Sequence, residues 1–281
     1  MTFISHSSSL GIWTVSYLDR FSGVARLYGT EALETFRTSK VAVVGIGGVG
    51  SWVAESLART GFENIHLIDM DDICVTNTNR QIHTNKTTVG QLKVEAMAER
   101  LRAINADINA VPIMDFLTKD NIPQYLTGFD FVIDAIDSVK VKAALIAWCK
   151  RNKVPIITTG AAGGQMDPTQ ITIGDLNKTY NDPLARKVRT ELRREYNFSR
   201  NQQRNYSVMC VYSTEQLNYP QPDGSICKQK AFTDGSAKLD CAVGLGAATM
   251  VTATFGLVAA SKVAEKLAGI VRKPKKPKHF K

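Results

Sequence analysis

The chain has 281 residues, enough for one large domain or two modest ones with a full hydrophobic core. Apolar residues make up 44% and charged residues 22%, so the composition excludes a wholly disordered chain and a fibrous repeat. The formal net charge is +9, and six of the cations lie in residues 272–281. Because Pro274 and Pro277 interrupt any helix there, we expect residues 271–281 to form a mobile basic tail, either solvated or in contact with nucleic acid or an anionic lipid surface.

The cysteines and the N-terminus indicate the compartment. The five cysteines are an odd number and include no C-x-x-C pair, which argues against a disulfide framework and against a tetrathiolate zinc site. Residues 1–15 have neither a basic n-region nor a long apolar core followed by a small-residue cleavage site, so we expect no secretory signal. Together these observations predict a protein of a reducing compartment, the cytoplasm.

The first 165 residues read as an N-terminal helical segment, 1–39, followed by strands that alternate with helices. The runs at 41–44 and 65–68 are apolar on both faces, as in strands buried within a parallel sheet. The predicted elements are, in order, strand 41–44, helix 50–60, strand 65–68, helix 90–105, strand 110–113, a strand ending at Asp134, helix 145–153 and a strand from residue 154. This alternation predicts an α/β fold with a doubly wound, Rossmann-like, mostly parallel sheet, whose nucleotide-binding domain spans residues 40–165.

Residues 166–270 are expected to extend the same fold with further helices and strands and to serve as a substrate and dimer region. A basic, helix-favouring segment covers 182–204, a strand is expected within 205–215, and 220–238 reads as a loop. Residues 241–260 carry no charge and are nominally long enough to cross a bilayer. Their small side chains favour instead a helix packed closely against the sheet or a twin subunit, so membrane association is disfavoured but stays open.

A glycine cluster marks a nucleotide site. It joins the first strand to the first helix of the alternating region, where backbone N–H groups and the positive helix end face a phosphate. Asp69 follows Gly50 by 19 residues, at the end of the next strand, where a carboxylate accepts hydrogen bonds from ribose hydroxyls. The glycines concerned are Gly45, Gly47, Gly48 and Gly50. These features predict a bound nucleotide and do not by themselves distinguish NAD from ATP.

A set of four residues beyond Asp69 favours ATP over NAD as the bound nucleotide. Asn77 and Arg80 lie just past the ribose acid, Lys93 lies on the next predicted helix, and Asp137 ends a later strand. A dehydrogenase has no need of this added set. Adenylation needs it, because attack on the α-phosphate expels pyrophosphate, so cations must meet the outer phosphates while a carboxylate holds Mg²⁺. We therefore predict Arg80, Lys93 and Asp137 as catalytic residues, with ATP and Mg²⁺ as cofactors.

These motifs resemble the ThiF/MoeB/HesA superfamily of ubiquitin-activating-type adenylating enzymes. The matching elements are GIGGVG at 45–50, LIDMD at 67–71, TNTNRQ at 76–81, VGQLK at 89–93 and DAID at 134–137. The resemblance implies that Asp69 holds the ribose, that Asn77, Arg80 and Lys93 contact phosphates, and that Asp137 serves the magnesium. Asp71, within LIDMD, joins the predicted nucleotide-binding residues. The resemblance also implies a homodimer with two ATP sites.

The flanking sequence is most similar to the tRNA threonylcarbamoyladenosine dehydratases of this superfamily. The pieces that carry this similarity are RFSGVARLYG at 20–29, ITTGAAGGQMDPTQI at 157–171, DPLARKVRTELRR at 182–194, VYSTEQ at 211–216 and LDCAVGLGAATMVTATFG at 239–256. The similarity implies ATP-dependent cyclisation of threonylcarbamoyladenosine next to the tRNA anticodon, through a carboxyl adenylate, with release of pyrophosphate and AMP. The basic segment suits an RNA partner, and the predicted RNA-binding residues are Arg186, Lys187, Arg189, Arg193 and Arg194.

Three alternatives stay open: adenylation of a ubiquitin-like sulfur-carrier protein, an NAD-dependent oxidoreductase, and a non-catalytic RNA-binding module. Many superfamily members open with R-[YF]-x-R, whose second arginine reaches the partner's ATP, whereas this chain has Gly23 at that place. Arg20 or Arg26 is expected to substitute. Relatives also use a cysteine for sulfur chemistry, which makes Cys227 and Cys241 the candidate reactive thiols, and the resemblance allows a sulfur-transfer partner.

Overall fold

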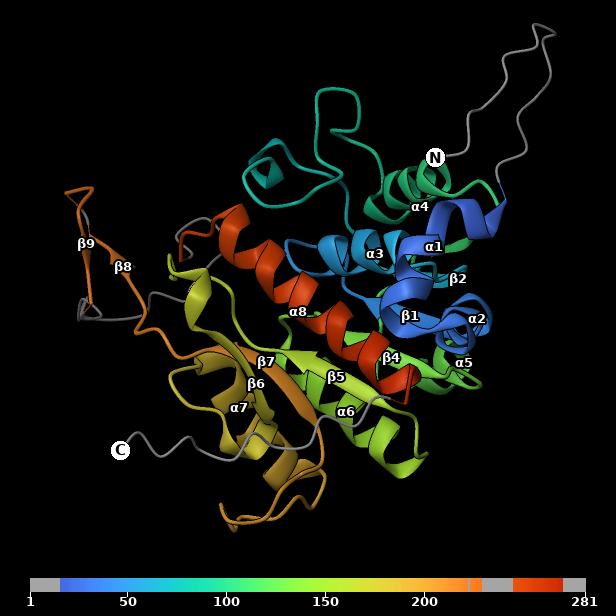
Figure 1. The fold of residues 1–281 in the computed structure, drawn as a ribbon. Coiled ribbons are helices and arrows are strands. Elements are labelled where there is room, and N and C mark those ends of the chain that lie inside the picture. Colours follow the sequence, from blue (N-terminus) through green and yellow to red (C-terminus); the bar gives the residue numbers. More distant parts are fainter. Residues whose placement is uncertain (1–15, 222, 229–244, 270–281) are drawn as a thin grey trace, which may run out of the picture.

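The computed structural model describes residues 16–221, 223–228 and 245–269. Its centre is a seven-stranded sheet with the strand order β3-β2-β1-β4-β5-β7-β6 (Figure 1). The strands are β1 (Lys40–Val44), β2 (Asn64–Ile68), β3 (Asn109–Ile113), β4 (Phe131–Asp134), β5 (Ile156–Thr159), β6 (Ile171–Asp175) and β7 (Met209–Ser213). All neighbouring pairs are parallel except β6 and β7. The predicted doubly wound, mostly parallel sheet is confirmed.

Helices cover both faces of the sheet, each over its own hydrophobic core. One face is covered by α1 (Tyr17–Tyr28), α2 (Thr30–Thr38), α3 (Gly50–Arg59), α4 (Lys93–Ile104) and α8 (Thr249–Leu267), and the other by α5 (Ile122–Leu126), α6 (Val139–Arg151) and α7 (Pro183–Glu195). Val53, Leu57 and Ala58, expected on one face of α3, are all fully buried. The two layers leave the carboxyl ends of the strands uncovered, and the site is built at that edge.

Residues 249–260 of the uncharged stretch belong to helix α8, which packs along α3 and against β5, β6 and β7. Small residues permit this close approach, because a Cβ on Gly256 would lie 2.7 Å from the Val49 carbonyl oxygen and 2.8 Å from the Trp52 Cβ. The prediction of a helix packed closely on the sheet is confirmed. Within the described ranges, no helix combines the length and hydropathy needed to cross a bilayer.

Several details differ from the sequence predictions. The basic helix α7 ends at Glu195, nine residues before the predicted end, because Asn197 adopts a left-handed conformation (φ 58°) that stops the helix. Strand β6 was not predicted; it enters antiparallel at the sheet edge beside β7. The short hairpin of β8 (Tyr219–Pro220) and β9 (Ile226–Cys227) lies in the predicted loop. The predicted tail 271–281 and Cys241 lie outside the described residues.

The strand order contains a topological switch point. From β1 the chain proceeds to β2 and β3 on one side, then returns to β4 on the other side of β1. The loops after β1 and β4 therefore leave in opposite directions and open a crevice between the carboxyl ends of these strands, where ligands bind in doubly wound sheets.

Candidate functional site

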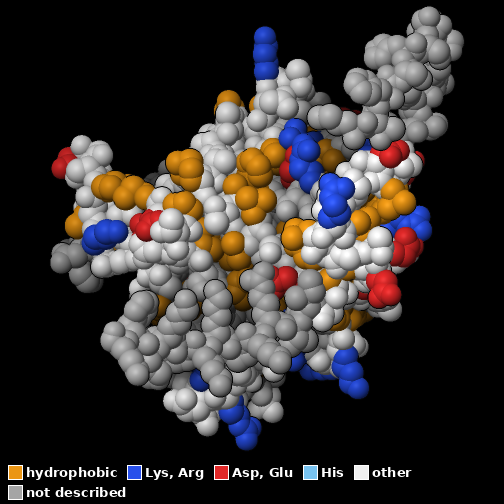
Figure 2. Space-filling model, viewed as in Figure 1, with side chains coloured by type: hydrophobic (Ala, Val, Ile, Leu, Met, Phe, Trp, Pro, Cys, Tyr) orange, Lys and Arg blue, Asp and Glu red, His pale blue; other side chains and the backbone are white. Residues whose placement is uncertain are grey.

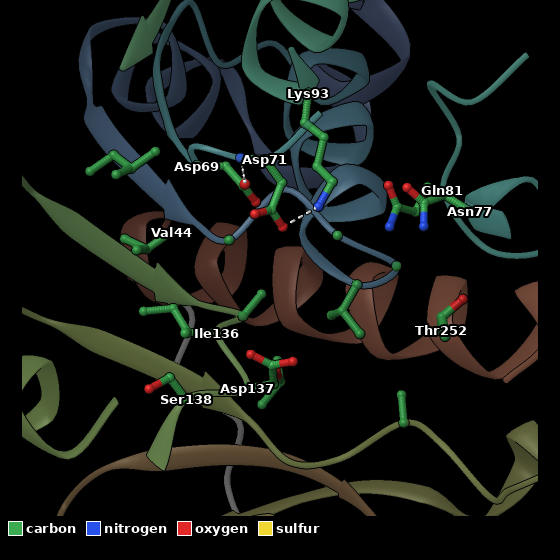
Figure 3. A pocket seen from close by; sticks show the side chains of 18 of the residues that line it. Val44, Asp69, Asp71, Asn77, Gln81, Lys93, Ile136, Asp137, Ser138 and Thr252 are labelled. Carbon is green, nitrogen blue, oxygen red and sulfur yellow. Dashed lines mark hydrogen bonds and ion pairs between the residues drawn. The ribbon is translucent and has the colours of Figure 1, made fainter. Parts of the chain in front are cut away.

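A cavity of about 1090 Å³ lies at this switch point. Its walls come from the loops after β1 to β5, from the start of α4 and from the first turns of α7 and α8. Figure 3 shows labelled side chains from β1, from the segments after β2 and β4, from the start of α4 and from α8 arranged around one open space. The volume is large enough for a nucleotide together with part of a second substrate.

The loop after β1 can be built only with glycine at its two ends. Gly45 has φ +87°, and a Cβ there would lie 2.9 Å from the Ala135 carbonyl oxygen. A Cβ on Gly50 would lie 1.7 Å from the Gly45 carbonyl oxygen. Gly45, Gly47 and Gly48 line the cavity, whereas Gly50 lies behind them as the first residue of α3. The start of α3 therefore presents backbone N–H groups and its positive dipole end to the cavity.

Asp69, at the end of β2, bonds to the glycine loop and to its own turn. Its Oδ2 accepts a hydrogen bond from the Ile46 N–H at 2.6 Å, and its Oδ1 accepts one from the Asp71 N–H at 2.9 Å. Asp69 is partly buried and lines the cavity. The carboxylate predicted to bind ribose therefore also fixes the glycine loop that lines the cavity.

Lys93 and Asp71 form an ion pair at the cavity wall. Lys93 Nζ lies 2.6 Å from Asp71 Oδ2, and the Lys93 N–H donates to the Asp71 carbonyl oxygen at 3.0 Å. The Lys93 side chain is buried, and Asp71 is about half exposed (Figure 3). This pairing holds the ammonium group beside the cavity and leaves two of its three hydrogens for other acceptors.

Asn77 and Arg80 come from the turn η1 (Val75–Asn77) and the residues that follow it. The Asn77 side chain is buried and accepts a hydrogen bond from the Cys74 N–H at 2.9 Å. The Arg80 guanidinium donates to the Thr76 carbonyl oxygen and to Asn79 Oδ1, both at 3.0 Å. Both residues line the cavity. Arg80 is thus bonded to neutral acceptors, and no ion pair within the described residues occupies its guanidinium group.

Asp137 lies across the cavity from the Lys93–Asp71 pair (Figure 3). Asp137 is exposed. The loop that carries it is anchored to the core by the buried ion pair of Lys142 and Asp134. Lys142 Nζ lies 2.9 Å from Asp134 Oδ2 and donates to the Ile136 carbonyl oxygen at 2.8 Å. Thr158 donates to the same Asp134 oxygen at 2.6 Å. These contacts fix the backbone immediately before Asp137.

The carboxylates at the cavity suit a magnesium ion that arrives with its nucleotide. Among the described residues, no group of three or more His, Cys, Asp or Glu side chains forms a ready metal cage. Mg²⁺ commonly binds through one or two carboxylates, phosphate oxygens and water. Asp137 offers an exposed carboxylate of this kind, so the donor set fits.

The structure also adds residues that the sequence analysis missed. Cys74 lines the cavity, and a hydrogen bond from the Thr76 hydroxyl, 3.2 Å from its sulfur, lowers the pKa of the thiol. Gln81 directly follows Arg80 in the TNTNRQ motif, which could have marked it. Thr252 comes from α8, and no local pattern near residue 250 points to the cavity. The missed cavity residues include Asp72, Cys74, Gln81, Asp115, Phe116, Thr118, Ser138, Leu184, Ala247 and Thr252.

Other predicted residues lie away from this cavity. Arg20 donates to the Ile104 carbonyl oxygen at 3.2 Å, and neither it nor Arg26 lines the cavity of its own chain. Cys227 is exposed on β9 and is likewise absent from the cavity wall.

The five cations predicted to bind RNA differ in their surroundings on α7. Arg189 donates to Thr179 and Arg193 donates to Tyr206 and Asn177, so these two guanidinium groups are engaged with the protein. Arg194 pairs with Glu191 and Glu195. Arg186 and Lys187 are exposed.

Comparisons with known proteins agree with this site. The sequence pattern of the ThiF family matches residues 21–281. The tRNA threonylcarbamoyladenosine dehydratase of Escherichia coli (strain K12) is 56% identical over 253 residues, which cover 90% of this chain and 94% of that protein. The solved structure of TcdA (CsdL) is 55% identical with a TM-score of 0.82, covering 90% of this chain and 95% of that chain. The solved complex of E. coli TcdA with ATP is 52% identical with a TM-score of 0.80 and the same coverage. This chain belongs to the ThiF family.

Proposed function

We propose that this chain is an ATP-dependent tRNA threonylcarbamoyladenosine dehydratase. The observation that carries the proposal is the convergence of Arg80, Lys93 and Asp137 on one cavity below a glycine loop. A relative named for this activity is 56% identical over 90% of the chain, and a relative of the same name has been solved with ATP. We expect the ATP-binding Rossmann-like domain at residues 40–165, the substrate and dimer region at 166–270, and a cytoplasmic location.

In the first step, a carboxylate oxygen of the threonylcarbamoyl group attacks the α-phosphorus of ATP. A P–O bond to that oxygen forms, the bond to the β-phosphate breaks, and pyrophosphate leaves. Arg80 and Lys93 hold cationic donors at the cavity wall, where they offset the charge that develops on the outer phosphates. Asp137 would hold Mg²⁺, which draws charge from the leaving group when bound.

In the second step, the ureido group of the same nucleoside attacks the activated carbonyl carbon. The ring closes, AMP leaves, and the nucleoside has lost the elements of water. Since both reacting groups belong to one substrate, the effective molarity reaches on the order of 10⁵ M in favourable cases. The protein therefore needs no covalent nucleophile for this step, and Cys227 is placed away from the cavity.

The RNA approaches over the start of α7. Leu184, in the first turn of α7, lines the cavity, and the exposed Arg186 and Lys187 follow within one turn. Because Arg189 and Arg193 are bonded to the protein and Arg194 is paired, we assign the main phosphate contacts of α7 to Arg186 and Lys187. Replacing both by glutamate should weaken tRNA binding and reduce its salt dependence, whereas Arg194→Gln should change little.

The working unit is a homodimer. Figure 2 shows hydrophobic side chains gathered over the middle of the face on which α8 lies in Figure 1. Met250 and Leu257 of α8 and Leu27 of α1 are exposed. Arg20 and Arg26 of α1 stay our candidates for the arginine that reaches the ATP of the partner subunit. Replacing Leu257 by glutamate should shift the protein toward monomer in light scattering.

Isotope exchange of pyrophosphate into ATP tests the function against the sulfur-carrier alternative. Exchange is expected with tRNA that carries threonylcarbamoyladenosine, and mass spectrometry should find the cyclised nucleoside. The two controls are the same tRNA without the threonylcarbamoyl group and a carrier protein that ends in Gly-Gly. Exchange that depends on the carrier protein, or that proceeds with unmodified tRNA, would contradict the proposal.

A further inference from the structure

His83 lies behind the glycine loop and takes no part in the site described so far. Its side chain is fully buried, at 1% exposure. Its Nε2 is 2.9 Å from the Ile46 carbonyl oxygen. A carbonyl oxygen can only accept, so Nε2 carries the hydrogen and the imidazole is the donor. Burial lowers the pKa of His83, which keeps the ring neutral with a bare Nδ1.

The bond to Ile46 is the one polar contact of this ring within the described part of the chain. Nδ1 has no hydrogen-bond partner among those residues. Within that part of the chain, the only polar group that the ring contacts is therefore the Ile46 carbonyl, so replacing the imidazole removes this hydrogen bond and no other.

The carbonyl that His83 holds belongs to the same peptide group as the Gly47 N–H. The peptide group is planar and trans, so its C=O and N–H point in opposite directions. With the Ile46 oxygen turned back toward the buried His83, the Gly47 N–H turns toward the cavity that Gly47 lines. The preceding peptide is fixed as well, because the Ile46 N–H donates to Asp69.

The donors of this loop are left available for a ligand. Within the described ranges, the N–H groups of Gly47, Gly48 and Val49 have no hydrogen-bond acceptor. They directly precede the first turn of α3, whose positive dipole end favours an anion. The orientation of the Gly47 peptide therefore decides whether its N–H joins this set.

We propose that His83 is a positioning residue for the triphosphate: by holding the Ile46 carbonyl, it aims the Gly47 N–H at a phosphate oxygen. This inference rests on the proposed use of ATP and extends it to a residue outside the cavity. His83 touches neither substrate nor reacting atoms and acts through the backbone.

Two substitutions separate the hydrogen bond from the packing. In His83→Gln, the side-chain amide nitrogen reaches about as far as Nε2 and can donate to the same carbonyl. In His83→Leu, an apolar side chain of comparable bulk has no donor. Calorimetry would measure the Kd of ATP and of adenosine for each protein, alongside its melting temperature.

The comparison of ATP with adenosine distinguishes positioning from general damage. We expect His83→Leu to weaken ATP binding by about 10- to 100-fold while adenosine binding changes less than about 3-fold, because only the phosphates meet the Gly47 N–H. We expect His83→Gln to recover most of the ATP affinity. Equal weakening for both ligands, or no recovery in His83→Gln, would overturn the proposal.

A replacement variant and an assay of the wild-type product complete the test. If His83→Leu does not fold, His83→Asn replaces it, since the shorter amide reaches only as far as Nδ1 and should show the same selective loss for ATP. Wild-type protein that binds ATP but forms no cyclised nucleoside would contradict the proposed function, while the role of His83 would still be decided by the two affinities.

Discussion

The two loops that meet at the switch point are anchored from behind in different ways. In the loop after β1, the Ile46 carbonyl is held by the neutral imidazole of His83. In the loop after β4, the Ile136 carbonyl is held by the ammonium of Lys142, which is paired with the fully buried Asp134. The first loop presents backbone donors to the cavity, and the second presents the carboxylate of Asp137.

The two anchors couple their loops to the stability of the fold to different degrees. A neutral hydrogen bond contributes about 0.5–1.5 kcal/mol, so its loss changes loop geometry more than global stability. Removing one partner of a buried ion pair leaves an uncompensated charge and costs about 3–5 kcal/mol. The position of Asp137 is therefore tied to the core, whereas the glycine loop can be changed locally.

The largest effect is expected from Lys142→Met. The substitution leaves Asp134 buried without its partner, so the free energy of unfolding should fall by about 3–5 kcal/mol in urea denaturation. The double variant Lys142→Met, Asp134→Asn removes the charge as well and should recover part of this loss. If Lys142→Met were as stable as the wild type, the loop after β4 would be no more strongly coupled to the stability of the fold than the loop after β1.

Asp137→Ala tests what the second loop presents to the cavity. Asp137 is exposed, so we expect little change in stability but a fall in kcat of about 10²- to 10³-fold in pyrophosphate release. Arg80→Ala should behave similarly. Asp72→Ala is the matched control, because Asp72 is also an exposed carboxylate that lines this cavity. Equal losses in the Asp72 and Asp137 variants would argue for a general charge effect.

Gly50→Ala tests the first loop without touching His83. The added Cβ would lie 1.7 Å from the Gly45 carbonyl oxygen, so the backbone must shift. We expect a loss of about 1–3 kcal/mol in unfolding free energy and weaker ATP binding. Gly47→Ala serves as the control for stability, because the nearest atom to a Cβ added there is 4.0 Å away. Unchanged ATP affinity in Gly50→Ala would contradict a rigid glycine loop.

The smallest effect concerns pH and a residue outside both loops. Burial, and then the charge of Lys40, lower the pKa of His66 on β2 to about 4. The unfolded chain therefore binds a proton near pH 6.5 that the folded chain does not, and stability falls as the pH drops from about 6.5 toward 4. His66→Gln should lose less melting temperature between pH 7 and pH 5 than the wild type. An equal loss in both proteins would assign the pH dependence elsewhere.

Local sequence patterns singled out residues that line one cavity, because these residues follow successive strands. Asp69 and Asp137 lie at or just after strand ends, and the carboxyl ends of parallel strands meet at one edge of the sheet. The glycine spacing marked the loop after β1 for the same reason. Arg189 and Arg193 show the limit, because their sequence spacing gives no sign that they bond to Thr179 and Tyr206.

The sequence by itself determined the alternation of strands and helices, the glycine turn and the charged residues at the strand ends, because these signals depend on residues close together in the chain. Tertiary structure alone decided that Thr252 of α8 reaches the cavity, that β6 enters antiparallel, and that His83 and Lys142 lie behind the two loops. Such contacts join distant segments, and they are selected by packing and by the cost of burying polar groups without partners.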